Sequence, residues 1–171
     1  MFNLNDQPIA PELERITSFH LGRFACSLTL KGKDSTRTVS LALGFQSLVD
    51  QVLKSHRALA LGVEEAIQIT EEHLMGMLLS LERPSPICSL SVEEPFVSLL
   101  PSNATAPGEP YALDQEALEL VFHQWLALLS GAKRERTFFR DGLVFFTKLL
   151  MLRESMHHLY IARFKEDPRP F

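Results

Sequence analysis

Residues 26–43, CSLTLKGKDSTRTVSLAL, carry the pattern that decides the predicted fold. Apolar and polar residues alternate with a period of two on both sides of residues 32–35, which have the glycine-containing, polar composition of a turn. This pattern is typical of two antiparallel strands joined in a hairpin, each with one face toward a core. The alternating apolar positions are Cys26, Leu28, Leu30, Val39, Leu41 and Leu43.

Downstream of the hairpin the period changes to that of a helix. Apolar residues recur at helical spacing over residues 45–53 and again over residues 63–67. Thr70 is a suitable N-cap for a helix over residues 71–81. A capping-box pattern that begins at Ser91 predicts one more helix start.

The stretch PSNATAPGEP, residues 101–110, is the clearest break in the chain. Three prolines, a glycine and small polar residues are typical of a linker or a long surface loop. We therefore predict an α+β domain over residues 1–100, a linker or surface loop over residues 101–113, and a helical part over residues 114–171.

Two helices are predicted in the back part. Asp114 is a suitable N-cap for the first, which runs to about residue 130 and stops at Gly131. The second covers residues 137–164, and the short link between the two predicts antiparallel packing. The fold class is therefore α+β: a small antiparallel β-sheet packed with helices, plus a C-terminal antiparallel helical pair.

The second of these helices has more apolar surface than one neighbouring helix covers. Phe146, Leu149 and Met156 lie on its apolar stripe and are the candidate residues for protein contact. The expected partner is a protein, either a different one or a second copy of this chain in a homodimer.

Composition excludes several classes of function. The 171 residues carry a formal net charge of −4, which does not favour nucleic-acid binding. The most apolar stretch, residues 143–152, is too short for a membrane span of about 20 residues. The first residues lack the basic and apolar segments of a secretory signal, and two cysteines make no disulfide framework. These features predict a reduced, cytoplasmic setting.

Few residues have the spacing that a catalytic, phosphate-binding or metal-binding site requires. No phosphate-binding glycine loop is present, and the paired glutamates, such as Glu71 and Glu72, are explained by helix starts. The adjacent His157 and His158 do not converge on one ion, and we expect His158 to face Glu154, four residues earlier, on a solvated surface.

The two cysteines each have two interpretations. Cys26 is either a small buried hydrophobic residue or a metal ligand. Cys88 is either a structural cysteine or a functional thiolate. It lies just ahead of the predicted helix start, where a thiolate that binds metal or attacks a substrate would be favoured.

The order of features in residues 17–100 resembles the U-type iron–sulfur cluster scaffold proteins. That family has a cysteine at a β-hairpin, a second in a loop that enters a helix, and a third after a proline-bearing loop. The matching segments here are residues 24–26 (FAC), 41–47 (LALGFQS), 61–70 (LGVEEAIQIT) and 84–89 (PSPICS).

The chain departs from that family at several ligand positions. Gly44 and Phe45 stand where the second cysteine is expected, and Ile87 replaces the histidine before the third. The resemblance leaves Cys26 and Cys88 as candidate ligands for an iron–sulfur cluster, iron or zinc. A standard cluster usually needs four ligands, so one chain does not supply a complete site.

Three functions follow as hypotheses. The resemblance implies a non-catalytic accessory or assembly protein that acts through protein contacts. The apolar helix indicates instead a homodimeric interaction or regulatory module without metal. The third hypothesis is an enzyme with Cys88 as nucleophile and a histidine as base, the candidates being His20, His56 and His73. The sequence favours a protein that is not an enzyme.

Overall fold

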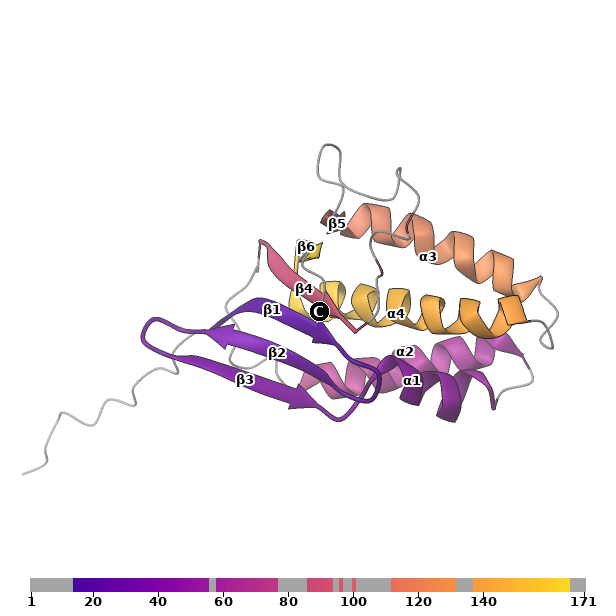
Figure 1. Cartoon of the computed structure of the whole chain (residues 1–171), viewed down its shortest axis with the longest axis horizontal. Helices are drawn as coiled ribbons and strands as arrows, with labels where there is room; N and C mark the ends of the chain where they lie inside the picture. The colour runs from indigo at the N-terminus through magenta and orange to yellow at the C-terminus, as the bar shows by residue number, and fades with distance from the viewer. Residues whose placement is uncertain are drawn as a thin grey trace, which may run out of the picture.

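The computed structural model describes residues 14–55, 58–76, 86–93, 96, 100, 112–131 and 137–166. These residues form an α+β structure in which strands and helices share one hydrophobic core (Figure 1). The strands are β1 (Arg15–Leu21), β2 (Cys26–Lys31), β3 (Thr36–Leu41), β4 (Cys88–Val92), β5 (Ala112–Asp114) and β6 (Arg163–Glu166). The helices are α1 (Phe45–Leu48), which continues as the π-helical turn η1 (Val49–Leu53), then α2 (Leu59–Met75), α3 (Gln115–Ser130) and α4 (Thr137–Leu159).

The described strands form one mixed sheet in the order β3-β2-β1-β4-β6-β5. Strands β1, β2 and β3 pair antiparallel, whereas β4 pairs parallel with both β1 and β6. The α+β class predicted from sequence is confirmed. The sheet is mixed rather than antiparallel, because β4 and β6 each return to it from a helical connection that reverses the chain direction.

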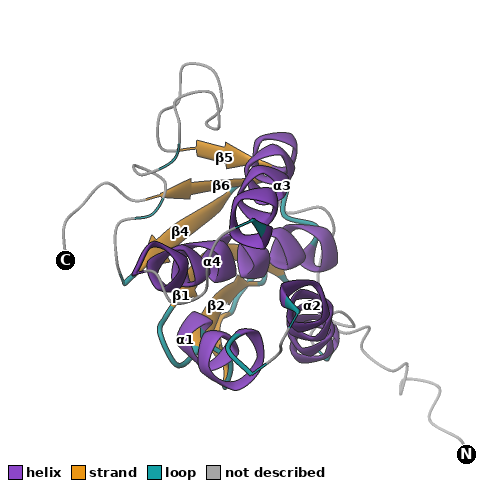
Figure 2. Ribbon diagram, turned by 90° about the vertical axis from the view of Figure 1, so that its right-hand side faces the viewer, coloured by secondary structure: helices purple, strands orange, loops and turns teal. Residues whose placement is uncertain are grey.

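Side chains alternate between a buried and a more exposed face of this sheet. Phe19, Leu28 and Leu90 are buried, whereas their strand neighbours such as Thr29 and Ser89 are partly or fully exposed. Because successive side chains of a strand point to opposite faces, the helices cover one face of these central strands. Among the helices, α4 lies between α2 and α3 and contacts both (Figures 1 and 2).

The predicted hairpin is confirmed as β2 and β3, with Cys26 opposite Leu41 and Lys31 opposite Thr36. Strand β1 was not predicted, because its sequence RITSFHL contains a register irregularity between Ile16 and Ser18 that breaks the period of two.

The segment after Cys88 is a strand, not the predicted helix start. Cys88 begins β4, whose residues alternate between buried and more exposed positions. The capping-box interpretation of Ser91 is therefore wrong: Ser91 lies in β4, and parallel pairing with β1 and β6 outweighs the local helix signal.

Helix α2 begins earlier than predicted, at Leu59. Thr70 is buried inside it rather than at its start, and its hydroxyl donates to the Ala66 carbonyl at 2.7 Å. A threonine can satisfy its hydroxyl in this way within a helix, which removes the need for a capping position.

Asp114 caps α3 as predicted, since its Oδ1 accepts from the Ala117 amide at 2.9 Å, and Gly131 follows the helix. Helix α3 packs on α4 where Gly142 gives room: a Cβ at Gly142 would lie 2.9 Å from a Leu129 methyl group.

Helix α4 ends at Leu159 rather than at residue 164. Tyr160 has a φ of 55°, a left-handed conformation that stops the helix and turns the chain into β6. Through β5 and β6 the back part adds two strands to the same sheet as β1–β4. The predicted linker lies mostly in residues 101–111, outside the described residues.

Within the described ranges, no helix is both long and apolar enough to cross a membrane. Lys148, in the most apolar stretch, is buried with its ammonium nitrogen 4.6 Å from the centre of the Phe45 ring.

Candidate functional site

The parallel strands β1, β4 and β6 end at one edge of the sheet. The last residue of β1, Leu21, is opposite Val92 at the end of β4, and β6 ends at Glu166. In open sheets, ligands bind outside the carboxyl ends of parallel strands. This edge, which we call the carboxyl-end edge, is therefore one candidate position for a binding site.

The turn after β1 is fixed against the start of α1. A Cβ at Gly22 would lie 2.3 Å from the Ala25 carbonyl oxygen, and a Cβ at Gly44 would lie 2.5 Å from the backbone of Arg23. The Gln46 amide donates to the Arg23 carbonyl at 2.9 Å. Two glycines thus permit a backbone approach that no other residue type allows.

The chain's own carboxylates accept hydrogen bonds from backbone amides at the carboxyl-end edge. The Arg23 amide donates to Glu93 Oε2 at 3.1 Å, and the Phe96 amide donates to Glu166 Oε1 at 3.3 Å. An external anion that binds the Arg23 amide therefore competes with the Glu93 carboxylate.

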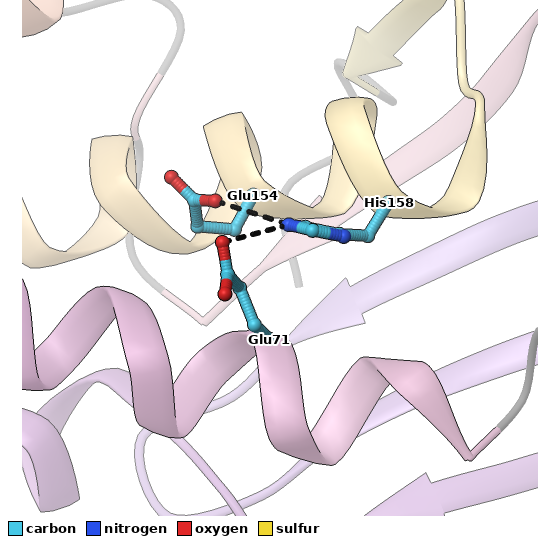
Figure 3. A group of neighbouring side chains, drawn as sticks. All are labelled: Glu71, Glu154 and His158. Carbon is cyan, nitrogen blue, oxygen red and sulfur yellow. Dashed lines mark hydrogen bonds and ion pairs between the residues drawn. The ribbon is translucent and has the colours of Figure 1, made fainter.

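A second group of polar side chains lies where α2 meets α4, and we call it the Glu–Glu–His cluster (Figure 3). His158 Nε2 lies 3.1 Å from Glu71 Oε1 and 3.5 Å from Glu154 Oε2, and the three atoms are all within 4.8 Å of one another. In the part of the chain that the structure describes, no other group of three His, Cys, Asp or Glu side chains has this geometry. The expected contact between His158 and Glu154 is confirmed, but its expected place on a solvated surface is wrong, because the Glu154 side chain is only 3% exposed.

A neighbouring ion-pair network holds one side of this cluster. Glu119 Oε1 on α3 accepts from Arg153 Nε at 2.9 Å and lies 2.7 Å from His157 Nε2. Burial raises the pKa of Glu119, but the hydrogen bonds from Arg153 and His157 outweigh it and hold the pKa below its usual value. Arg153 Nη1 also contacts Glu154 Oε1, so the network reaches the Glu–Glu–His cluster.

The structure does not bring the two candidate thiol ligands together. Cys26 on β2 pairs with Leu21 on β1, and Leu21 in turn pairs with Val92 on β4, two strands away from Cys26. Cys88 lies four residues before Val92 along β4. At about 3.3 Å per residue and 4.8 Å per strand, the two cysteines are about 16 Å apart. Both are free and buried, and neither belongs to the group of possible metal ligands found among the described residues.

We expect both thiols to be unreactive in the folded chain. Burial raises the pKa of Cys26 and of Cys88 to about 12, so little thiolate forms near neutral pH. Labelling with Ellman's reagent at pH 8 should be more than about 100-fold slower than for a free thiol. Both cysteines should react at the normal rate in denaturant. Rapid labelling of either one in buffer would contradict this burial.

The histidines considered as bases have other partners. His20 Nδ1 is 2.9 Å from the Ser91 hydroxyl, and His73 Nδ1 is 2.8 Å from the Ile69 carbonyl. His56 lies outside the described residues. Cys88 donates weakly to the Ser89 carbonyl at 3.6 Å, so no thiol–imidazole pair is formed by the described residues.

The three candidate interaction residues lie in the interior of the chain. Phe146 and Leu149 are fully buried and Met156 is nearly so, because α4 runs between the other helices and the sheet. The Phe146 ring stacks on Phe122 of α3, with 5.0 Å between ring centres. These side chains therefore present no exposed stripe to a partner.

Sequence reasoning missed Glu71 as part of a cluster. Glu71 was assigned to a helix start, whereas it lies in the last third of α2. The four-residue spacing of Glu154 and His158 indicated that they share a face, but only the packing of α2 on α4 adds the third side chain.

Comparisons with known proteins give a fold but no family. No protein-family model matches the chain, and no curated protein sequence matches it. A solved structure of the Aquifex aeolicus PPX-GPPA enzyme matches with a TM-score of 0.62 and 12% identity over 93% of this chain and 55% of its own.

Other solved structures agree. A type II crystal structure of the Aquifex aeolicus Ppx/GppA phosphatase gives a TM-score of 0.64 at 13% identity, covering 93% of this chain and 54% of its own. An exopolyphosphatase-like protein gives 0.64 at 12% identity, covering 97% and 57%. The chain thus spans about half the length of the structures it matches, and at this identity the likeness establishes the fold alone.

The resemblance to the U-type iron–sulfur scaffolds is wrong, and so is the accessory function drawn from it. The structural matches are to Ppx/GppA proteins and to an exopolyphosphatase-like protein instead. Short hairpin, helix and proline-loop segments recur in many α+β proteins, and their order along the chain did not specify the parallel pairing of β1, β4 and β6.

Proposed function

We propose that the chain is a phosphate-handling domain that takes part in hydrolysis of phosphoanhydride or phosphate-ester substrates. The observation that carries this proposal is the match of 93–97% of the chain to structures of a Ppx/GppA phosphatase and an exopolyphosphatase-like protein. Because one fold can host many functions, the proposal also needs support from this chain's own groups.

The proposed position for phosphate is the carboxyl-end edge, at the turn formed by residues 22–25. There the Arg23 amide already holds an anionic oxygen, that of Glu93. A phosphate oxygen is an equally suitable acceptor for a backbone amide, so it can replace the carboxylate in the same hydrogen bond. The rigid packing of this turn on Gly44 keeps the amide in place for that exchange.

The proposed chemistry is attack by water rather than by a protein thiol. Both cysteines are buried and have raised pKa values, which makes them poor nucleophiles. Since the chain spans about half of the structures it matches, we propose that a second unit, in the same protein or another, supplies the remaining groups of the site.

The proposal is tested by measuring the binding of inorganic polyphosphate to the purified chain. Fluorescence anisotropy of a labelled polymer reports the binding. Replacement of Glu93 by glutamine removes the competing negative charge, and we expect about two- to fivefold tighter binding. Glu64→Gln is the matched control, because Glu64 is exposed on α2 and its loss changes the net charge equally. The polyphosphate affinity of Glu64→Gln should change by less than that of Glu93→Gln.

Release of phosphate from the same polymer is measured in parallel. Binding that tightens in Glu93→Gln, with release by the chain or by the chain plus its second unit, supports the proposal. The proposal is overturned if polyphosphate binds neither to the wild-type chain nor to Glu93→Gln. It is also overturned if Glu93→Gln and Glu64→Gln raise the affinity for polyphosphate by the same factor.

A further inference from the structure

We propose that the Glu–Glu–His cluster binds one divalent transition-metal cation such as Zn²⁺, and that this ion joins α2 to α4. Two carboxylates and one imidazole form a ligand set that zinc accepts, whereas Mg²⁺ and Ca²⁺ favour oxygen ligands alone. This inference is independent of the proposed phosphate function, because it concerns a different group of residues and its test measures the metal alone.

Two of the three distances between the ligand atoms fit a tetrahedral ion. Zinc lies about 2.0–2.2 Å from nitrogen and oxygen ligands, so two ligands of one tetrahedral ion are about 3.3 Å apart. His158 Nε2 is 3.1 Å from Glu71 Oε1 and 3.5 Å from Glu154 Oε2. Figure 3 shows the imidazole directed between the two carboxylates, with Glu71 on α2 and the other two on α4.

The packing of two helices brings these ligands together. Glu154 and His158 are four residues apart on α4, the spacing that puts two side chains on one helix face. Glu71 reaches them from α2, which packs on α4. One helix therefore supplies two ligands, and the helix packing supplies the third.

The buried ligand is held by groups outside the cluster. The Glu154 side chain is only 3% exposed, and Arg153 Nη1 contacts its Oε1, which leaves Oε2 on the side of His158. Arg153 is itself bound by Glu119. Hydrogen-bond partners of this kind orient metal ligands.

The other two ligands leave a path for the ion. The side chains of Glu71 and His158 are 40% and 26% exposed, so a cation can enter from solvent and a water molecule can occupy the fourth position.

The test is a calorimetric titration of the chelator-treated full chain with Zn²⁺. We expect one ion per chain and a melting temperature that rises with free Zn²⁺. His158→Ala and Glu71→Gln should each weaken binding at least about 100-fold. Both positions are partly exposed, so these variants should fold, which circular dichroism checks.

Two neighbouring residues provide matched controls. Glu72 and His73 are exposed residues next to Glu71 on α2 and lie outside the cluster, so Glu72→Gln and His73→Ala should bind Zn²⁺ as the wild type does. The proposal is overturned if Zn²⁺ does not bind, which would leave an ion-pair triad only. It is equally overturned if binding survives in both His158→Ala and Glu71→Gln.

Discussion

Replacement of Phe146 by alanine is expected to lower the free energy of unfolding by about 3–5 kcal/mol. The ring is fully buried and stacks on Phe122 with 5.0 Å between ring centres, in the packing of α4 on α3. Truncation removes this contact and leaves a cavity. The elements that surround the cavity cannot collapse fully into it. Urea denaturation followed by circular dichroism measures the change, provided the slope of the transition is preserved.

Phe24→Ala is the control for the same chemical change on the surface. Phe24 is 69% exposed, so its truncation should change the free energy of unfolding by less than about 0.5 kcal/mol. The comparison also separates a core role of Phe146 from the interface role predicted from sequence. A Phe146→Ala chain of normal stability that dissociates from dimer to monomer in sedimentation would contradict the core assignment.

Gly44→Ala is expected to destabilise the fold by about 1–3 kcal/mol. The added Cβ would lie 2.5 Å from the backbone of Arg23, a distance at which one of the two segments must move. The φ of Gly44 is −130°, an extended conformation that any residue adopts, so the requirement is one of space rather than of backbone conformation. Movement of the turn at residues 22–25 should also weaken polyphosphate binding at the carboxyl-end edge.

Gly76→Ala provides the matched control. Gly76 follows α2, and nothing lies within 4 Å of the position that its Cβ would occupy. Its replacement should leave stability unchanged or raise it by up to about 1 kcal/mol, because alanine restricts the unfolded chain. Equal melting temperatures for Gly44→Ala and wild type would show that the turn moves at no cost in stability, which would contradict a rigid turn.

Local sequence patterns were sufficient where local interactions decide the structure. The period of two in residues 26–43 predicted β2 and β3, and Asp114 with Gly131 marked the ends of α3. The four-residue spacing of Glu154 and His158 predicted their contact. In each case the partners lie on one element or in one hairpin, so a short stretch contains the information.

Other features depend on residues far apart in the chain. Ser91 carries a helix-start signal, yet its segment forms β4 because β1 and β6 offer parallel pairing on both sides. The predicted interface residues of α4 became core because α3, α2 and the sheet surround them. A single-sequence pattern shows that a helix face is apolar but not which surface covers it.

The sequence by itself determined the α+β class, the hairpin, the caps of α3 and the apolar stripe of α4, because these follow from spacing along the chain. Tertiary structure alone decided the strand order, the separation of Cys26 from Cys88, and the meeting of Glu71 with His158. The physical reason is that a ligand set or a parallel sheet joins segments whose distance apart is fixed by packing, and no local periodicity encodes that packing.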